Sequence, residues 1–521
     1  MCNNIDVMRK FLLIIVAVFA ISCEKSFDVV DCHVVDYSQL ACVKLENPYS
    51  VSNMKRALKS LKTRGICGIS ESDIQTTHYY IKFKPKDENE LEVLKRDTTI
   101  VLYGYPLDCE MSIPFNGLYR DPEVPEGVPT YQYASIPYVK WQTEKEYLAQ
   151  IVEYEVLEEL FIPDEFKNGK QNIETRTGIL SVSYDFISEL VTESLMLTGN
   201  EDPTISTTRA EKWTPAGRIY YFDESSCEDR GMTGIKVRAR RWFTTHIGFC
   251  NEDGYYSCDG MFERDANYSF NLERHEFKIN GVNGVTTEYD GPKQTGNWDY
   301  YFTRSYSQPN YAATVAFRAA YHYYYQDIGG LRRPPQNSFW NTQLKLKIMN
   351  EEDSSNGTFN SARRFLGLDS AIKLYNPHNN MVDLYATAIH EMAHAAHWRM
   401  VVDEPNTNRV EDYHNAEDKM LESWARGVQW FLTSMMYTDY PGGNISSVYT
   451  NVVIDMVDTE EDNSKNKGKS SDYGDNVDGY TMPQIETALI GCNTFNEWRD
   501  NIKNLYDNET EENLDELFAA W

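Results

Sequence analysis

The chain has 521 residues and a formal net charge of -29 at pH 7, from 79 acidic and 50 basic side chains, and no basic block interrupts the acidity. This charge argues against nucleic acid as a partner and indicates a soluble, highly charged surface. The length exceeds that of a single hydrophobic core, so we expect two to four domains. The helices and strands predicted below indicate a multidomain α+β protein.

The N-terminus has the pattern of an export signal. Residues 8–10 include two basic side chains, residues 11–20 are continuously apolar, and Ser22 precedes Cys23. The apolar run is too short to span a bilayer comfortably, as in a signal peptide. The segment resembles a bacterial lipoprotein signal, which implies a signal over residues 1–23, lipidation of Cys23 and anchoring to a membrane of the bacterial cell envelope. An ordinary secretory signal, with Cys23 in a disulfide, stays open.

Cysteine usage agrees with export. Apart from Cys2 and Cys23, eight cysteines remain: Cys32, Cys42, Cys67, Cys109, Cys227, Cys250, Cys258 and Cys492. An oxidising compartment permits disulfides, but spacing leaves their connectivity open. Cys250 and Cys258 flank an Asn-Glu-Asp-Gly turn and are the easiest pair to bridge. No Cys-x-x-Cys pair occurs, which argues against a cysteine zinc site or a redox motif.

The region 24–140 is expected to be a small α/β accessory domain. Hydrophobic periodicity predicts helices at 53–62 and 87–95 and strands at 78–85 and 99–103. This unit resembles the small propeptides and inhibitory modules of peptidases, which implies an inhibitory or folding role; a simple accessory or anchoring role is the alternative. A charged stretch at 143–165 predicts a helix, so residues 141–205 are expected to be a helical linker region.

The region 206–285 is expected to consist mainly of strands. Strands are predicted at 216–222, 232–245 and 248–257, with a hairpin at the Asp-Gly turn. The glycine-led strand, the Gly-x-x-Val strand and the final Asp-Gly-x-Tyr-Ser hairpin resemble the carboxypeptidase regulatory-like domain. This resemblance implies a small β-sandwich over residues 206–285 that serves as a spacer or a binding platform. Three basic residues suggest either the solvated face of a strand or a phosphate or glycan site: Arg238, Arg240 and Arg241.

The region 286–521 is expected to form the C-terminal domain. It contains a predicted amphipathic helix at 310–325, a strand at 342–349, and a strand at 370–375 that we expect to lie at the edge of a sheet. Helices at 482–489, 494–506 and 511–521 close the chain. Their expected core residues are Trp498, Leu505, Leu514, Leu517 and Trp521.

The chemistry of the chain concentrates in residues 385–399, an alanine-rich stretch without Gly or Pro that predicts a helix capped by Asp383. His390 and His394 lie one turn apart on the same face, an arrangement that grips Zn²⁺. Glu391 lies beside them, where its carboxylate can take a proton from a zinc-bound water. This is the His-Glu-x-x-His motif of zinc-dependent peptidases.

The motif resembles the zincin clan and, within it, the gluzincin type, in which a glutamate on a following helix is the third zinc ligand. The metzincin pattern fails because Met400 stands where its third histidine would be. Glu422 is the expected third ligand, since the small Ala425 one turn later would let the two helices approach closely. Glu417 is the competitor, with a surface or capping role as its alternative. Arg426 departs from the gluzincin pattern, so we expect Asp412 or Asp418 to orient a zinc histidine.

The resemblance implies that 286–521 is a zincin-like catalytic domain in which substrate backbone adds to the strand at 370–375. It also implies a zinc-dependent endopeptidase acting on peptides or proteins outside the cytoplasm, with Glu391 as general base. Candidates for stabilising the oxyanion are His397, His414 and Tyr480; a polar role at the cleft rim is the alternative for His397. Two other functions stay open: a catalytically silent, lipid-anchored binding or adhesion protein on a zincin scaffold, and a metal-dependent deacylase or mucin-directed peptidase. The substrate, the side of the membrane that the lipoprotein faces and the oligomeric state are not indicated.

Overall fold

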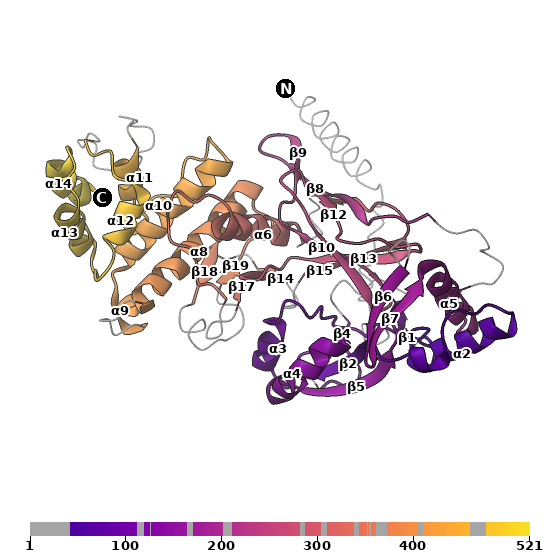
Figure 1. The fold of residues 1–521 in the computed structure, drawn as a ribbon. Helices are drawn as coiled ribbons and strands as arrows, with labels where there is room; N and C mark the ends of the chain where they lie inside the picture. Colours follow the sequence, from indigo (N-terminus) through magenta and orange to yellow (C-terminus); the bar gives the residue numbers. More distant parts are fainter. Residues whose placement is uncertain are drawn as a thin grey trace, which may run out of the picture. The chain divides into compact units, whose positions relative to one another are not determined.

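The computed structural model describes residues 42–521 except for 112–118, 126, 164–169, 202–210, 282–286, 304–309, 338–342, 352, 354–355, 361–371, 404–409 and 459–475. The predicted signal and Cys23 lie outside the described residues. Within these described ranges, every helix is too short or too polar to cross a membrane. The protein is of the mixed α+β type, and its elements follow from N to C terminus in Figure 1.

The N-terminal region is built on an antiparallel sheet in the order β4-β2-β5, with β4 at Gln132–Pro137, β2 at His78–Lys84 and β5 at Glu153–Leu160. Ile81 and Phe83 are buried on one face of β2, and Tyr80 on the other face is buried against Phe243, so both faces of this strand are covered. Helices α3 (Glu88–Lys95) and α4 (Tyr138–Ile151) flank the sheet. The predicted helix at 87–95 and strand at 78–85 are therefore confirmed.

The helical linker expected over 141–205 is wrong. After α4 this segment forms β5, then a hairpin of β6 (Lys170–Thr175) and β7 (Gly178–Ser183), and then α5 (Tyr184–Leu197), which packs on α2 (Val51–Thr63). The charged residues of β5 favour a helix locally, but pairing with β2 overrides that preference. The strand expected at 99–103 is also absent, because only Tyr103 makes a β-bridge, to Tyr133. A disulfide joins Cys42 on β1 (Cys42–Lys44) to Cys109 on β3 (Cys109–Met111).

Two sheets face each other in the central region. One has the order β11-β10-β13-β15, with bounds Thr244–Phe249, Lys236–Arg241, Ala266–Asn271 and Glu288–Gln294. The other has the order β12-β8-β16, with bounds Tyr255–Ser257, Ala216–Asp223 and Tyr300–Phe302, and β9 (Glu228–Gly231) pairs with β8. Between the sheets lies an aromatic core that includes Tyr221, Tyr268, Phe270 and Trp298.

Three expectations for this region are corrected. The turn at 251–254 carries the chain from β11 to the other sheet, since β11 pairs with β10 and β12 pairs with β8, so it is not a hairpin. Cys250 and Cys258 are buried free thiols. Arg238 and Arg240 are buried, not solvated, because the N-terminal region covers the outer face of β10.

The C-terminal region contains a mixed sheet in the order β14-β17-β19-β18, with bounds Phe277–Asn280, Leu344–Ile348, Ile372–Leu374 and Gly357–Phe359. The first three strands are parallel, and β18 runs antiparallel to β19 at the edge. The predicted edge strand at 370–375 is therefore an inner strand, since β18 covers it. β14 belongs to this C-terminal sheet although it precedes residue 286, and β16 belongs to a sheet of the central region although it follows residue 285. The expected domain boundary at residue 285 is therefore also wrong.

Helices complete this region. α6 (Asn310–Tyr325) and α10 (Asp418–Met436) both pack on α8 (Met381–Asp403), and the predicted bounds of α6 are confirmed. The remaining helices are α9 (Val410–Asn415), α11 (Val452–Val457), α12 (Met482–Thr487), α13 (Phe495–Leu505) and α14 (Leu514–Ala520). Trp498, Leu514 and Leu517 are buried as predicted, and the half-buried Trp521 donates its indole N–H to Asp455. Leu505 is 54% exposed, so its predicted core role is wrong.

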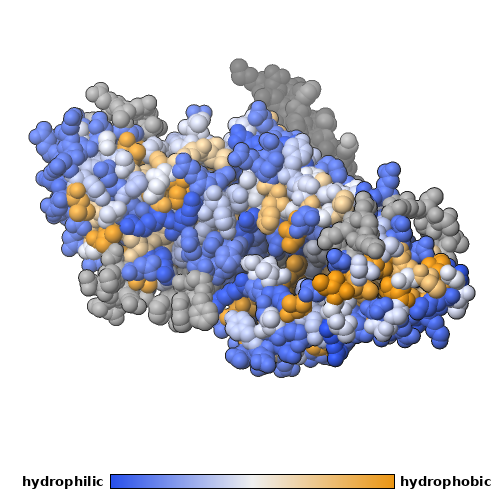
Figure 2. All heavy atoms as spheres, viewed as in Figure 1, coloured by the Kyte–Doolittle hydropathy of each residue, from blue (hydrophilic) through white to orange (hydrophobic). Residues whose placement is uncertain are grey.

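The surface is mainly hydrophilic on the face that Figure 2 shows, in agreement with the net charge of -29. Apolar side chains gather on this face over the N-terminal region, around β7 and α5. Exposed apolar residues of that region include Val43, Ile179 and Leu197.

Candidate metal centre

The first two candidate ligands lie on α8, a helix of 23 residues. The side chain of Asn380 caps its start, because Asn380 Oδ1 accepts the backbone N–H of Asp383 at 2.9 Å. Asp383 is thus the third residue of the helix and not its cap. His390 and His394 follow on one buried face, and their Nε2 atoms lie 3.1 Å apart.

Glu422 on α10 completes the centre. Its Oε2 lies 2.9 Å from His390 Nε2 and 3.3 Å from His394 Nε2, so the three ligand atoms lie within 4.8 Å of one another. Ala425, one turn further along α10, is fully buried, which agrees with the predicted close approach of α10 to α8. Burial alone would raise the pKa of Glu422, but the two histidines together outweigh it and hold that pKa well below its usual range.

Glu417, the competing ligand, lies elsewhere. It immediately precedes α10, and its Oε2 accepts the backbone N–H of Phe495 at 2.8 Å. Phe495 is the first residue of α13, whose N-terminal N–H groups need acceptors. Glu417 therefore caps a neighbouring helix, the role that the sequence left as its alternative.

The groups that orient the histidines differ from those expected. His390 Nδ1 lies 3.1 Å from Gln429 Oε1, and the Gln429 amide donates to the Tyr440 hydroxyl at 2.6 Å, which fixes the amide's orientation. An Nδ1–H that donates to Gln429 leaves the Nε2 lone pair of His390 for a metal. The buried Tyr413 hydroxyl lies 3.4 Å from His394 Nδ1. Asp418 is exposed, and the side chain of Asp412 lies outside the described residues.

Glu391 points to the edge strand of the sheet. It is 5% exposed, and burial raises its pKa to about 7, with His390 and the backbone of Phe359 opposing the shift and Glu422 adding to it. A Cβ atom at Gly357 would lie 2.7 Å from both Cγ and Oε1 of Glu391. Only glycine lets β18 approach the carboxylate this closely, so the edge strand and the candidate base are adjacent.

Tyr449 is a site residue that the sequence did not reveal. Its ring centroid lies 5.9 Å from that of His390, and its hydroxyl is close enough to the ligand Glu422 to be affected by that carboxylate's charge. Burial, followed by Glu422 and Glu391, raises its pKa to about 12. Nothing in the sequence separates Tyr449 from the other 35 of the 36 tyrosines, because its position depends on how its loop folds.

Two residues of α10 hold the Tyr449 loop. Ser423 Oγ donates to the Val448 carbonyl at 3.2 Å and accepts from Thr450 Oγ1 at 2.7 Å. Arg426 donates to Asn444 O at 2.7 Å and to Asn451 Oδ1 at 2.8 Å. Arg426, the departure from the gluzincin pattern, thus fixes the loop that carries Tyr449.

The three predicted oxyanion stabilisers lie in different environments. His397 is 3% exposed and packs edge-on against Tyr413, and burial, assisted by His394, lowers its pKa to about 3. It is therefore not at the cleft rim. His414 is exposed on α9, whereas Tyr480 is buried and donates its backbone N–H to Met456 on α11.

The donor set fits zinc. Two imidazole nitrogens and one carboxylate oxygen converge, and three protein ligands leave a position for water or substrate in a tetrahedral site. No protein-family model matches the chain, and no curated protein matches it. The functional argument therefore depends on the geometry of this centre.

Proposed function

We propose that the chain is a zinc-dependent peptidase of the gluzincin type. The observation that carries the proposal is the convergence of His390, His394 and Glu422 next to the buried carboxylate of Glu391. A purely structural zinc site is closed by four protein ligands and has no use for a neighbouring base, whereas a catalytic site keeps one position open. Zinc bound there would polarise the scissile carbonyl and lower the pKa of a water molecule.

Glu391 handles the proton in this proposal. It accepts the proton of the attacking water and returns it to the nitrogen of the leaving amine. Two features support the assignment: its carboxylate is next in sequence to a ligand histidine, and it is buried against β18 through Gly357. Burial keeps bulk water away from the carboxylate, so the proton is exchanged with the substrate.

Tyr449 is proposed to donate a hydrogen bond to the oxyanion that forms during hydrolysis. Its ring lies 5.9 Å from the ring of the ligand His390, and its raised pKa keeps the phenol protonated at neutral pH. Side chains of α10 hold its loop, so the donor is oriented before substrate arrives, which is what makes such donors effective. Tyr449 replaces His397, His414 and Tyr480 as the preferred stabiliser.

The substrate class follows from β18. Among the strands that the structure describes, β18 has a partner on one side only, β19, and it lies beside Glu391. An extended peptide can add to the free edge by main-chain hydrogen bonds, which places a backbone carbonyl near the base without selecting a particular side chain. A peptide or protein is therefore the proposed substrate.

The other regions are proposed to serve this activity. The two facing sheets of the central region support the resemblance to the carboxypeptidase regulatory-like domain and a spacer role. Buried ion pairs from Glu92 on α3 to Lys278 and Lys345 favour a permanent accessory role for the N-terminal region over a removable inhibitor. The apolar run at 11–20 and Cys23 support export and lipid anchoring in a bacterial cell envelope.

The test is to measure zinc content and hydrolysis of an unbiased peptide library for the wild type and three variants. We expect one zinc per wild-type chain, loss of zinc in Glu422→Ala, and retained zinc without cleavage in Glu391→Gln. Glu417→Gln is the matched control, since it removes the rival carboxylate from the start of the same helix and should change neither quantity. A wild type that binds zinc but cleaves nothing would identify a binding protein on a peptidase scaffold.

A further inference from the structure

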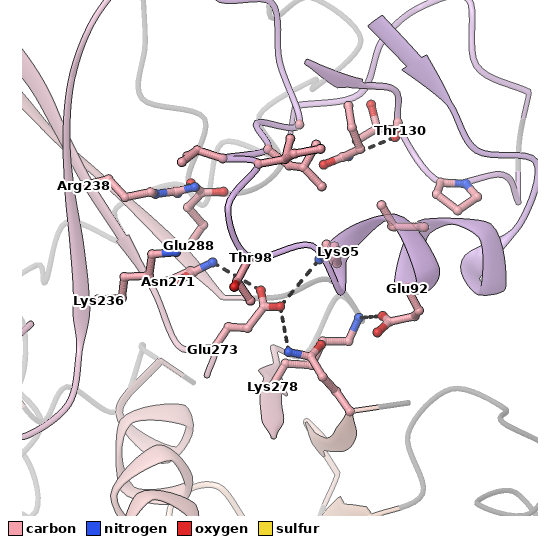
Figure 3. Close-up of a pocket in the computed structure, with 18 of the residues that line it drawn as sticks. Glu92, Lys95, Thr98, Thr130, Lys236, Arg238, Asn271, Glu273, Lys278 and Glu288 are labelled. Carbon is pink, nitrogen blue, oxygen red and sulfur yellow. Dashed lines mark hydrogen bonds and ion pairs between the residues drawn. The ribbon is translucent and has the colours of Figure 1, made fainter. Parts of the chain in front are cut away.

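A second candidate site lies away from the metal centre. A cavity of about 1090 Å³ has α3 and residues 98–105 on one side and the outer face of the sheet β11-β10-β13-β15 on the other (Figure 3). Its described lining contains none of the candidate zinc ligands. This volume is at the upper end of the range for small-molecule sites.

The floor of the cavity combines cations with apolar side chains. Val237 and Ala239 of β10 point into the core between the sheets, so Lys236 and Arg238 point the other way, into the cavity, as Figure 3 shows. Across the ladder to β11, Lys236 is opposite Phe249 and Arg238 is opposite Ile247, which place apolar surface beside each cation. On the opposite side of the cavity lie further apolar side chains, including Leu91, Ile100 and Leu102.

The charges in this cavity do not balance locally. Three carboxylates of the lining already have cationic partners: Glu92 pairs with Lys278, Glu273 with Lys95, and Glu288 with Arg238. Lys236 has no hydrogen-bond or ion-pair partner among the described residues, in a chain that is strongly acidic overall. Burial, followed by the positive charges of Arg238 and Arg274, lowers the pKa of Lys236. The negative charge of Glu273 opposes this shift, but Glu273 forms its ion pair with Lys95. A part-buried ammonium without a partner is unfavourable, and an anion in the cavity would supply one.

We propose that this cavity binds a small organic monoanion, a carboxylate attached to an apolar body. The carboxylate pairs with the Lys236 ammonium beside the Arg238 guanidinium, and the apolar body lies on Ile247 and Phe249. A monoanion matches the single lining ammonium that has no partner among the described residues, whereas the second charge of a phosphate would be repelled by the nearby carboxylates of Glu273 and Glu288. The site requires no zinc and is independent of the proposed peptidase activity.

The test is isothermal titration calorimetry of the purified protein with sodium phenylacetate, sodium 4-phenylbutyrate, phenyl phosphate and the neutral isostere phenylacetamide. We expect saturable binding of at least one carboxylate, and at least tenfold weaker binding of both the amide and the phosphate. Lys236→Gln should weaken carboxylate binding about tenfold or more, equivalent to about 1.4 kcal/mol. Lys236→Arg, which keeps the charge, should retain most of the affinity.

Lys293→Gln is the matched control. Lys293 lies on β15 of the same sheet, with its side chain 54% exposed, and it does not line this cavity. The Lys293→Gln variant removes the same charge. A loss of carboxylate affinity in Lys236→Gln but not in Lys293→Gln therefore shows that the ligand pairs with Lys236 in the cavity. The proposal is overturned if neither carboxylate binds with a Kd below about 10 mM, or if phenylacetamide or phenyl phosphate binds as tightly as phenylacetate. It is also overturned if Lys236→Gln, with unchanged thermal unfolding, binds the carboxylates as tightly as the wild type does.

Discussion

Glu92 on α3 accepts a hydrogen bond of 2.9 Å from the Lys278 ammonium on β14, although the two residues are 186 positions apart in the sequence. Lys345 on β17 lies 3.5 Å from the same Glu92 oxygen, and all three side chains are less than 5% exposed. A single carboxylate therefore joins the N-terminal region to the sheet whose edge strand lies beside Glu391. Because the charges are buried, the loss of one partner should change the free energy of unfolding more than the loss of a partner from a surface ion pair would.

Glu92→Gln should destabilise the protein strongly. The variant leaves two buried lysines without their carboxylate, and removal of one partner from a buried ion pair costs about 3–5 kcal/mol. The measurement is chemical denaturation followed by circular dichroism. Glu90→Gln, on the same helix but not buried, is the control and should change the free energy of unfolding by less than about 1 kcal/mol. A Glu92→Gln variant as stable as the wild type would show that the joint contributes little to stability.

The same carboxylate should make stability depend on pH. Burial alone would raise the pKa of Glu92, but Lys278, Lys95 and Lys345 outweigh it and lower this pKa to about 2 from the usual 4.5. Because the folded pKa is below the unfolded one, the stabilisation is complete above about pH 4.5 and is lost as the pH falls towards 2, a change on the order of 3 kcal/mol. The difference in unfolding free energy between the wild type and Glu92→Gln should therefore narrow over this interval, and a constant difference would contradict the argument.

The centre of the site could be predicted because its signals are local. An alanine-rich stretch predicts a helix, and helical periodicity alone places His390 and His394 on one face. Glu422 came from the resemblance to the gluzincin type, which implies a glutamate on a following helix, and the small Ala425 supported this choice because it marks where α10 could approach α8. The sequence also located β2, β8 and α6, whose alternation or helical period is strong over at least seven residues.

What could not be predicted depends on contacts between distant segments. β18 has only three residues, too few to show a period, yet it takes the edge position expected for residues 370–375. The charged β5 segment favours a helix until β2 pairs with it. Arg238 is indistinguishable in sequence from a solvated strand residue, because the segment that covers it lies more than a hundred residues earlier.

Gln429 should control zinc affinity. Its amide oxygen accepts from His390 Nδ1, so Gln429→Ala removes the group that fixes the tautomer and the ring. Loss of such a partner weakens metal binding about 10–100-fold. Competition with a zinc chelator measures the effect, and Asp418→Asn is the control, since Asp418 is exposed and was the orienting residue that the sequence suggested. Weaker binding in the Asp418 variant and not in the Gln429 variant would reverse the assignment.

Tyr449→Phe should lower kcat and leave both zinc content and KM nearly unchanged, because the hydroxyl contributes mainly in the transition state. Loss of one oxyanion donor reduces kcat about 100–1000-fold. Tyr480→Phe is the matched control, since the Tyr480 hydroxyl is buried and has no hydrogen-bond partner among the described residues. Equal losses in the two variants, or a change confined to KM for Tyr449→Phe, would remove Tyr449 from the catalytic step.

Gly357→Val should abolish cleavage without removing zinc. Any Cβ at this position would lie 2.7 Å from Glu391 Oε1 and 2.9 Å from Thr387 Cγ2. Valine adds two methyl groups to this Cβ, so either β18 or the Glu391 carboxylate must move. The zinc ligands belong to α8 and α10 and not to β18, so metal content should stay at one per chain. Thr358→Ala, which alters an exposed residue of the same strand, should keep most of the activity. Measured together, zinc content and peptide hydrolysis distinguish a displaced base from a collapsed site, because only a collapsed site would lose the metal as well.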